Sequence, residues 1–465
     1  MNMINVRRLT VMTFLGAGML SGISAQVSPL QVDTLKETKI PAQWDLQSCI
    51  DYAKEQNITI RKNRITAAST QIDVKTAKAA MFPSLSFSTS QQVVNRPYQE
   101  TSSRVSGSEI ISSNSKTSYN GNYGLNASWT LYNGNKRLKT IQQEKLNNQM
   151  AELDVATSEN NIQESIAQVY IQILYAAESV KVNENTLQVS IAQRDRGQEL
   201  LNAGSIAKSD LAQLEAQVST DRYQLVTAQA TLEDYKLQLK QLLELDGENE
   251  MNIYLPALSD ENVLAPLPTK KDVYIRALSL RPEIEASKLN VEASELGIGI
   301  AKSSYLPTIS LSAGIGTNHT SGSDFTFGEQ VKNGWNNSIG LSVSVPIFNN
   351  RQTKSAVQKA KLQYETSMLS LLDEQKTLYK TIEGLWLDAN SAQQRYAAAN
   401  EKLKSTQISY ELISEQFNLG MKNTVELLTE KNNLLQAQQE QLQAKYMAIL
   451  NTQLLKFYQG DQLAI

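Results

Sequence analysis

The chain has 465 residues, of which 20% are charged, and a formal net charge of −3. This balance carries no general signature of nucleic-acid binding. One cysteine, Cys49, and one histidine, His319, exclude a disulfide framework and leave little material for zinc or histidine chemistry. Beyond the N-terminus no apolar run approaches the ~20 residues of a membrane helix. With no phosphate loop, metal cluster or nucleophile–base pair, we expect neither an enzyme nor a bound cofactor.

Residues 1–25 have the pattern of a secretory signal peptide. Arg7 and Arg8 precede the apolar stretch 9–20, and Ala25 is a small residue suited to cleavage. The alternative is an uncleaved anchor. The pattern predicts export, with no lipid-anchor cysteine after the cut.

The chain repeats itself. Residues 79–86 resemble 303–310, and residues 204–211 match 420–427. We therefore predict two copies of a helix–strand–strand–helix unit. The predicted organisation is a first repeat at 26–245, a linker at 246–270 and a second repeat at 271–465.

Two segments, 135–202 and 351–418, contain no proline and predict helices of about 100 Å each. Leu211, Val218 and Leu225 begin a seven-residue repeat, which is typical of helices packed side by side. An isolated helix on a globular body is the alternative, but no such body would be long enough. Two shorter helices would together line each long one. The shorter helices are expected at 44–81, 208–245, 284–304 and 423–458.

Four segments alternate between apolar and small polar residues, as Leu85 and Phe87 do with the serines beside them. Because the polar side carries almost no charge, the alternation favours a sheet between lipid and water over a soluble sheet on a core. The polar connections 91–117 and 317–335 are expected to be mobile outer loops. The strands are predicted at about 84–93, 118–131, 308–316 and 338–346.

Four aromatic residues lie near the ends of these strands and suit a membrane interface. Ordinary core positions are the alternative for each of them. They are Trp129, Tyr132, Trp335 and Phe348.

A sheet in a bilayer must close, because an open edge exposes unpaired backbone groups to lipid. Four strands are too few, since membrane barrels need about eight or more. Two chains would give eight strands with a filled interior, and three would give twelve with a lumen. The small polar residues favour three chains. We therefore predict a mainly α protein with a membrane β part, a trimeric 12-stranded barrel continued by a long α-helical barrel.

The pattern resembles the TolC-like outer-membrane efflux proteins over nearly all of the mature chain. The resemblance implies a homotrimer with its barrel in the outer membrane and its helices in the periplasm. It also implies a periplasmic adaptor and, through it, an inner-membrane pump as partners, and an equatorial belt at the linker. The marks that carry it are Phe82-Pro83, Leu306-Pro307, Trp44-Asp45-Leu46, Arg281-Pro282-Glu283-Ile284 and the two glycine-led helix tips.

The same resemblance places Glu426 at the periplasmic aperture and makes Lys422 and Asp210 closing links. Phe417 stands where the family usually has tyrosine, so a hydroxyl bond is missing. Thr429 replaces the family's second acid, which weakens the expected cation selectivity. A plainer alternative is that Asp210 and Glu426 are acids that stabilise helix N-termini.

Gly204 and Gly420 are expected to relieve the tight turns between antiparallel helices. The surface around them is an alternative candidate for the adaptor contact. The resulting hypothesis is a passive outer-membrane exit duct of a tripartite efflux system. The alternatives are the outer component of type I protein secretion, which uses the same fold, and a periplasmic coiled-coil adaptor. Adaptors usually carry one helical hairpin rather than two repeats.

Overall fold

The computed structural model describes residues 41–98, 102–106, 109–113, 116–246, 251–256, 263–321 and 325–463. The predicted signal peptide at 1–25 lies outside these residues. The chain divides into two units, Met1–Gln43 and Trp44–Ile465. All the helices and strands discussed below belong to the second unit.

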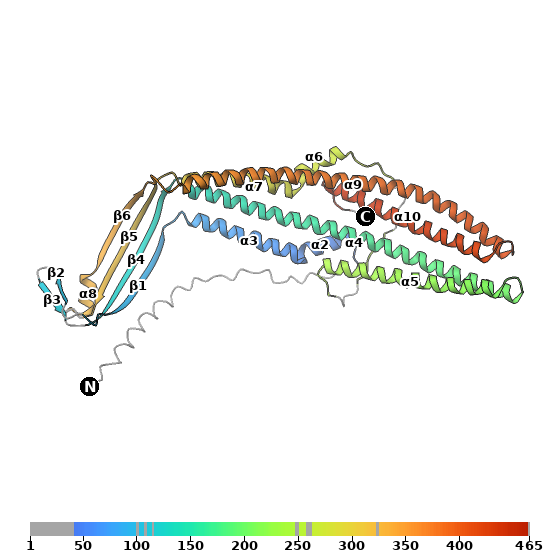
Figure 1. Ribbon diagram of the computed structural model, residues 1–465, viewed down its shortest axis with the longest axis horizontal. Coiled ribbons are helices and arrows are strands. Elements are labelled where there is room, and N and C mark those ends of the chain that lie inside the picture. The colour runs from blue at the N-terminus through green and yellow to red at the C-terminus, as the bar shows by residue number, and fades with distance from the viewer. Residues whose placement is uncertain are drawn as a thin grey trace, which may run out of the picture. The chain divides into compact units, whose positions relative to one another are not determined.

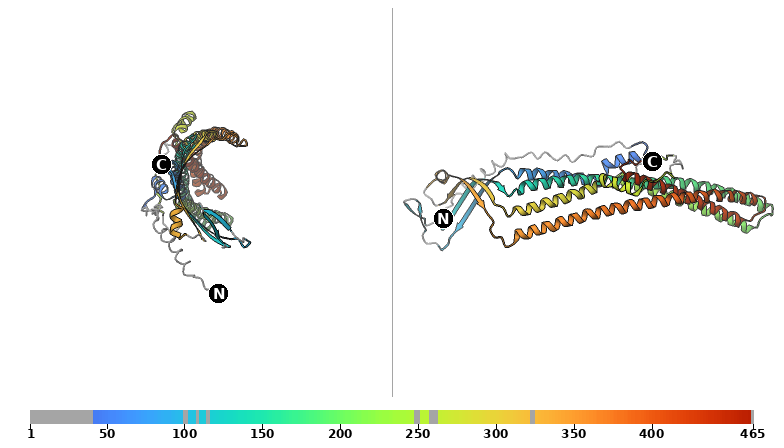
Figure 2. Two further views of the ribbon diagram at one scale, coloured as in Figure 1. Left: turned by 90° about the vertical axis from the view of Figure 1, so that its left-hand side faces the viewer. Right: turned by 90° about the horizontal axis from the view of Figure 1, so that it is seen from above.

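The two longest described helices have 67 residues each, and each lies beside shorter helices (Figures 1 and 2). They are α4 (Lys136–Asn202) and α9 (Gln352–Asn418). Helices α3 (Ile58–Ala79) and α5 (Lys208–Leu242) both pack on α4. In the same way α7 (Pro282–Ser303) and α10 (Thr424–Tyr458) both pack on α9. Because α7 also contacts α4, the order α3–α4–α7–α9 forms one layer with α3 and α9 at its edges.

The single helix expected at 44–81 is wrong, because the chain forms α2 (Leu46–Gln56) and α3 with Asn57 between them. The Asn57 side chain accepts hydrogen bonds from the backbone of Thr59 and Ile60 and so caps α3. Its Nδ2 also donates to the Leu242 carbonyl at 3.0 Å. This tertiary contact fixes the break.

A second break separates α6 (Lys270–Leu280) from α7. Arg281 lies at the junction, and Pro282 occupies the first turn of α7, where proline is tolerated. The Arg281 side chain is buried and pairs with Glu164 at 3.0 Å and Glu283 at 2.8 Å. Its guanidinium also stacks 4.0 Å from the ring centre of Tyr458, so one cation joins α4, α7 and α10.

Four antiparallel strands form a sheet in the order β1–β4–β5–β6 (Figure 1). The described edge strands, β1 and β6, each pair on one side only. All four strands overlap the predicted segments. Their bounds are β1 Ser84–Asn95, β4 Thr117–Asn133, β5 Thr308–Thr320 and β6 Asn336–Ser344.

The register extends the predicted alternation across the whole sheet. One row joins Leu85, Ala127, Ala313 and Ile339, and the next joins Ser86, Asn126, Gly314 and Ser338. Since neighbouring residues on a strand point to opposite faces, one face is apolar and the other carries small polar groups. The apolar face is uncovered, with Ile339 84% exposed.

The two polar connections are not simple loops. The first contains a small hairpin of β2 (Ser102–Ser106) and β3 (Glu109–Ser113), and the second contains α8 (Phe327–Asn333). His319 belongs to the connection 317–335 that was expected to be a loop, yet it is only 7% exposed, because β5 extends to Thr320 and the Phe327 ring covers the imidazole. The expectation failed because polar composition concealed the longer strand.

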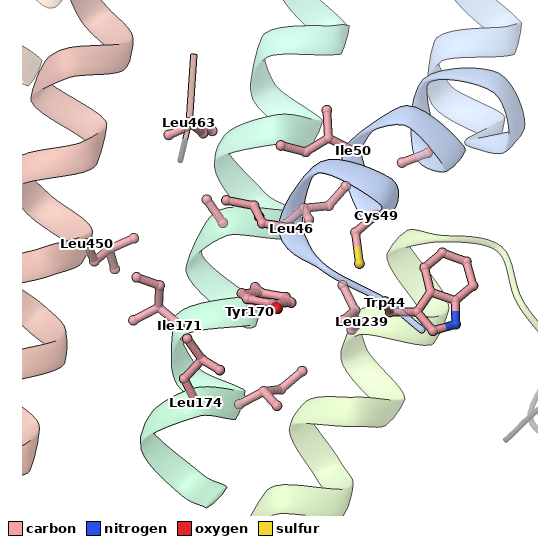
Figure 3. Packing of buried hydrophobic residues seen from close by; sticks show 14 of the residues in the cluster. Trp44, Leu46, Cys49, Ile50, Tyr170, Ile171, Leu174, Leu239, Leu450 and Leu463 are labelled. Atoms are coloured by element: carbon pink, nitrogen blue, oxygen red, sulfur yellow. The ribbon is translucent and has the colours of Figure 1, made fainter. Parts of the chain in front are cut away.

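The largest buried cluster lies where α2, α4, α5 and α10 meet (Figure 3). Trp44 is fully buried there, and its backbone exchanges hydrogen bonds with the linker residues Asn252 and Tyr254. The Tyr170 hydroxyl donates to the Tyr254 carbonyl at 2.6 Å. Burial raises the pKa of the Cys49 thiol to about 12, so this cysteine is an unreactive core residue. The described part of the linker is therefore packed onto the helices.

Candidate functional site

The candidate site is formed by the tips of two helical hairpins, α4–α5 and α9–α10. Gly204 and Gly420 lie at the turns, and both have φ of +73°. An L side chain is strained in this left-handed region, which explains glycine at both turns. The following residues, Ser205 and Met421, donate backbone hydrogen bonds to Leu200 at 2.8 Å and Gln416 at 2.9 Å. The two repeats thus build the same turn.

Both tip acids cap their own helices. The Glu426 amide donates to Asn423 Oδ1 at 2.9 Å, and the Asn423 amide donates to Glu426 Oε2 at 3.2 Å. Asp210 Oδ2 accepts the Ala207 amide at 3.0 Å. These contacts agree with the plainer interpretation of both acids as helix N-terminal residues.

Glu426 also carries an ion pair. Lys422 Nζ lies 2.6 Å from Glu426 Oε1, with both side chains partly exposed. Hydrogen bonds from Lys422 and from the Asn423 amide lower the pKa of Glu426, so it keeps its charge below the pH at which an ordinary glutamate is neutralised. A cation thus accompanies the acid expected at the aperture.

The structure does not bring Lys422 and Asp210 together within one chain. Among the described contacts, Lys422 pairs with Glu426 and Asp210 binds the Ala207 backbone. Phe417 is buried near the end of α9. The closing link of Lys422 with Asp210, and the aperture roles expected for Glu426 and Phe417, therefore stay predictions.

The two hairpins are tied together above their tips by a buried polar network that sequence analysis missed. Lys431 on α10 forms an ion pair with Asp221 on α5, and the two side chains are only 3% and 2% exposed. Ser190 on α4 contacts both of them. Burial lowers the pKa of Lys431, an effect that its bond to Asp221 partly offsets.

A sequence signal for this network did exist. Asp221 lies three residues after Val218, and Lys431 lies three residues after Leu428, at spacings that place both in the helix–helix seam. A charge at such a position needs a buried partner. The network makes the two hairpins one connected unit.

The four predicted interface aromatics are all exposed in the chain. Trp129, Tyr132 and Phe348 lie at the end of the sheet next to the helices, whereas Trp335 precedes β6 at the far end. The Trp129 indole donates to the Met81 carbonyl at 2.7 Å, which anchors its ring beside the end of α3.

Within the described residues, no helix is long and apolar enough to cross a membrane. In the same part of the chain, no group of three or more His, Cys, Asp and Glu side chains is arranged to hold a metal ion. The described chain thus belongs to a class of proteins with two similar long-helix units and one sheet. The apolar face of this sheet is exposed, and its edge strands are paired on one side only.

The chain belongs to the outer membrane efflux protein family, which it matches over residues 49–244 and 273–460. It is 24% identical to the outer membrane efflux protein BepC of Brucella suis over 63% of this chain and 61% of that protein. It is also 24% identical to the outer membrane protein TolC of Escherichia coli, over 61% of this chain and 58% of that protein. The matches thus span about three fifths of either relative.

The fold is similar to a solved structure of CusC, a protein described as forming a transmembrane channel. The TM-score is 0.76 at 19% identity, covering 92% of this chain and 96% of that one. At this identity the likeness concerns the fold alone. It agrees with the predicted combination of long helices and a short sheet.

Proposed function

We propose that the protein is a trimeric exit duct in the outer membrane, the outer part of a tripartite efflux system that docks a periplasmic adaptor and, through it, an inner-membrane pump. The observation that carries this proposal is the sheet. It has an uncovered apolar face, a small polar face and two edges that are open in the described chain. In a membrane barrel the apolar face would contact lipid, and the polar face would contact water in the lumen.

Closure of the ring follows from the edges. Edge strand β1 directly follows edge helix α3 in the sequence, and edge strand β6 directly precedes edge helix α9. A head-to-tail contact would therefore pair β6 with β1 and α9 with α3 of the next copy. Three copies would give twelve strands, enough for a lumen.

The edge helices carry exposed apolar stripes suited to this contact. On α3 the stripe has the seven-residue spacing of a helix–helix seam. A second stripe lies on α9. The stripes comprise Ile58, Ile65 and Ile72 on α3, and Leu362, Leu369 and Leu372 on α9.

A disulfide between the stripes tests the trimer. The double variant Ile72→Cys/Leu369→Cys is expected to yield cross-linked dimers and trimers on oxidation, because both positions lie at one level of the layer. Hydrogen bonds mark that level: Thr70–Asn148 at 3.1 Å, Gln143–Ala293 at 3.0 Å and Ser294–Ser367 at 2.8 Å. The measurement is non-reducing electrophoresis of the membrane protein.

Each single-cysteine variant is the matched control and should give at most a dimer. The native Cys49 should stay silent, since it is buried. A ladder that stops at dimers in the double variant would contradict the trimer. Absence of the protein from the outer-membrane fraction would contradict the location.

The tips are proposed as the periplasmic aperture, with Glu426, Lys422, Asp210 and Phe417 at its constriction and the surface around Gly204 and Gly420 as the adaptor contact. The support is the adjacent hairpins and the Lys422–Glu426 pair. In a trimer three such pairs would surround the axis, and each lysine would offset one carboxylate. The tip would then hold less net negative charge than its acids alone imply.

Removing the lysine is expected to strengthen cation preference. In planar bilayers, Lys422→Ala should show larger single-channel conductance and higher cation-to-anion permeability than the parent, because Glu426 loses its countercharge. Without Lys422 the pKa of Glu426 should return toward 4.5, so the added preference should fade as the pH falls to that value.

Lys288→Ala is a matched control, because it removes a lysine from an exposed pair with Glu285 on α7. Glu426→Gln should shift the permeability toward anions. Equal conductance and selectivity in the parent and Lys422→Ala would refute the aperture assignment. Export of polypeptides remains the alternative cargo for the same duct.

A further inference from the structure

Helix α8 lies beside the sheet at the end away from the long helices (Figure 1). The Phe327 ring contacts the His319 ring with centres 5.0 Å apart, and Thr317 donates to the Val331 carbonyl at 2.7 Å. His319 and Thr317 share a face of β5 with Ile315, since side chains alternate along a strand. The helix is therefore on the side proposed to face lipid.

Beneath α8 the apolar face ends in a patch of polar and aromatic groups. His319 pairs with Gly121 across the strands, and its ring packs on Tyr119 and Tyr123. The Tyr119 hydroxyl donates to Gln91 at 2.6 Å. A polar row on a lipid-facing surface is costly unless it lies at the interface or is covered. Helix α8 covers the His319 end of this row through Phe327.

The spacing along β5 puts α8 at a membrane interface. Ile309, which pairs with Tyr132 near the helix end of the sheet, is ten residues before His319. At ~3.4 Å per residue and a tilt of ~40°, this separation corresponds to a height of ~26 Å. An outer-membrane barrel has an apolar band ~25 Å tall with aromatic girdles at both ends. Tyr132 and α8 are one such band apart.

The side chains of this segment suit that depth. Phe325, Phe327 and Trp335 are 49%, 46% and 57% exposed, while Glu329 and Lys332 supply charges between them. Thr326 and Glu329 form a capping box, so the short helix has a fixed start. Large aromatics beside charged groups are typical of the zone between acyl chains and head groups.

We propose that α8, together with Phe325 and Trp335, is an interfacial anchor that rests in the head-group zone of the outer leaflet. This inference rests on the proposed function, since it requires the apolar sheet face to contact lipid. Its partner is the lipid surface itself. In a trimer, three anchors would set the depth of the barrel from outside.

A nitroxide label on α8 tests the anchor. Gly328→Cys is suitable, because an added Cβ there meets no atom within 4 Å and Cys49 is buried. The labelled protein would be placed in vesicles of phosphatidylethanolamine and phosphatidylglycerol. A water-soluble nickel relaxant should have less access to this label than to one at Lys208→Cys on a helix tip. Dissolved oxygen should have more.

A label at Leu341→Cys, on the apolar face of β6, distinguishes a failed anchor from a sheet that does not face lipid. Deep burial at Leu341 with partial burial at Gly328 would support the anchor. Deep burial at Leu341 with full water access at Gly328 would overturn the anchor and leave the duct standing. Water access at both labels would overturn the lipid-facing sheet, and the anchor with it.

Discussion

Replacing Lys431 with alanine is expected to destabilise the protein by about 3–5 kcal/mol, because it leaves a buried carboxylate without its cation. Asp221 and Lys431 are both almost fully buried, and Ser190 cannot replace the lost charge. The expected result is a clear fall in the midpoint of thermal unfolding. Far-ultraviolet circular dichroism of the purified protein measures it.

Two controls isolate the cause. Lys422→Ala removes a lysine from a partly exposed pair at the tip of the same hairpin and should leave the midpoint nearly unchanged. The double variant Lys431→Met/Asp221→Leu removes both buried charges and should recover most of the lost stability. If Lys431→Ala melted like the parent, the pair would not be buried as the structure places it.

Replacing Arg281 with methionine should cost about 3 kcal/mol, since Glu164 and Glu283 would share a largely buried site without a cation. The stacking on Tyr458 would be lost as well. The stability of Arg281→Lys should lie between those of the parent and Arg281→Met, because lysine keeps the charge but lacks the planar guanidinium group. Arg276→Met, an exposed arginine on α6, is the matched control.

The loss in Arg281→Met should depend on pH in a definite direction. Burial already raises the pKa of Glu164 above 4.5, against the opposing effect of Arg281. Without Arg281 this pKa rises further, so the folded state binds the proton more tightly than the unfolded state. The variant should therefore gain stability as the pH falls toward 4.5 and lose it as the pH rises through the folded-state pKa. Denaturation midpoints from pH 4.5 to 8 measure this, and a flat profile would contradict the assignment.

Periodicity in the sequence predicted the large elements well because each has a long, uninterrupted pattern. The absence of proline and the leucine repeats gave α4, α5, α9 and α10, and alternation gave the four strands. The break at Asn57 was missed because it depends on a contact with Leu242, far away in the chain. Helix α8 was missed because seven polar-rich residues carry no usable period.

For the candidate site, the sequence predicted where the residues lie in the fold better than which residues they contact. The glycine turns follow from local backbone demands and were found at both tips. The spacing of Lys422 and Glu426 already allows an i,i+4 pair. The expected link of Lys422 to Asp210 is not formed within the described chain, and nothing local specifies it. Nothing local specifies the pair of Lys431 and Asp221 either, which only the packing of three helices brings together.

The main buried cluster has a consequence for the order of folding. It joins Trp44 and Leu46 near the start of the described chain to Leu454 and Leu463 near its end. Such a core closes only when the last helix has arrived, because contacts so distant in sequence form late. A chain threaded outward from its N-terminus would thus stay open during translocation. Closure of this core would wait until α10 and Leu463 have emerged.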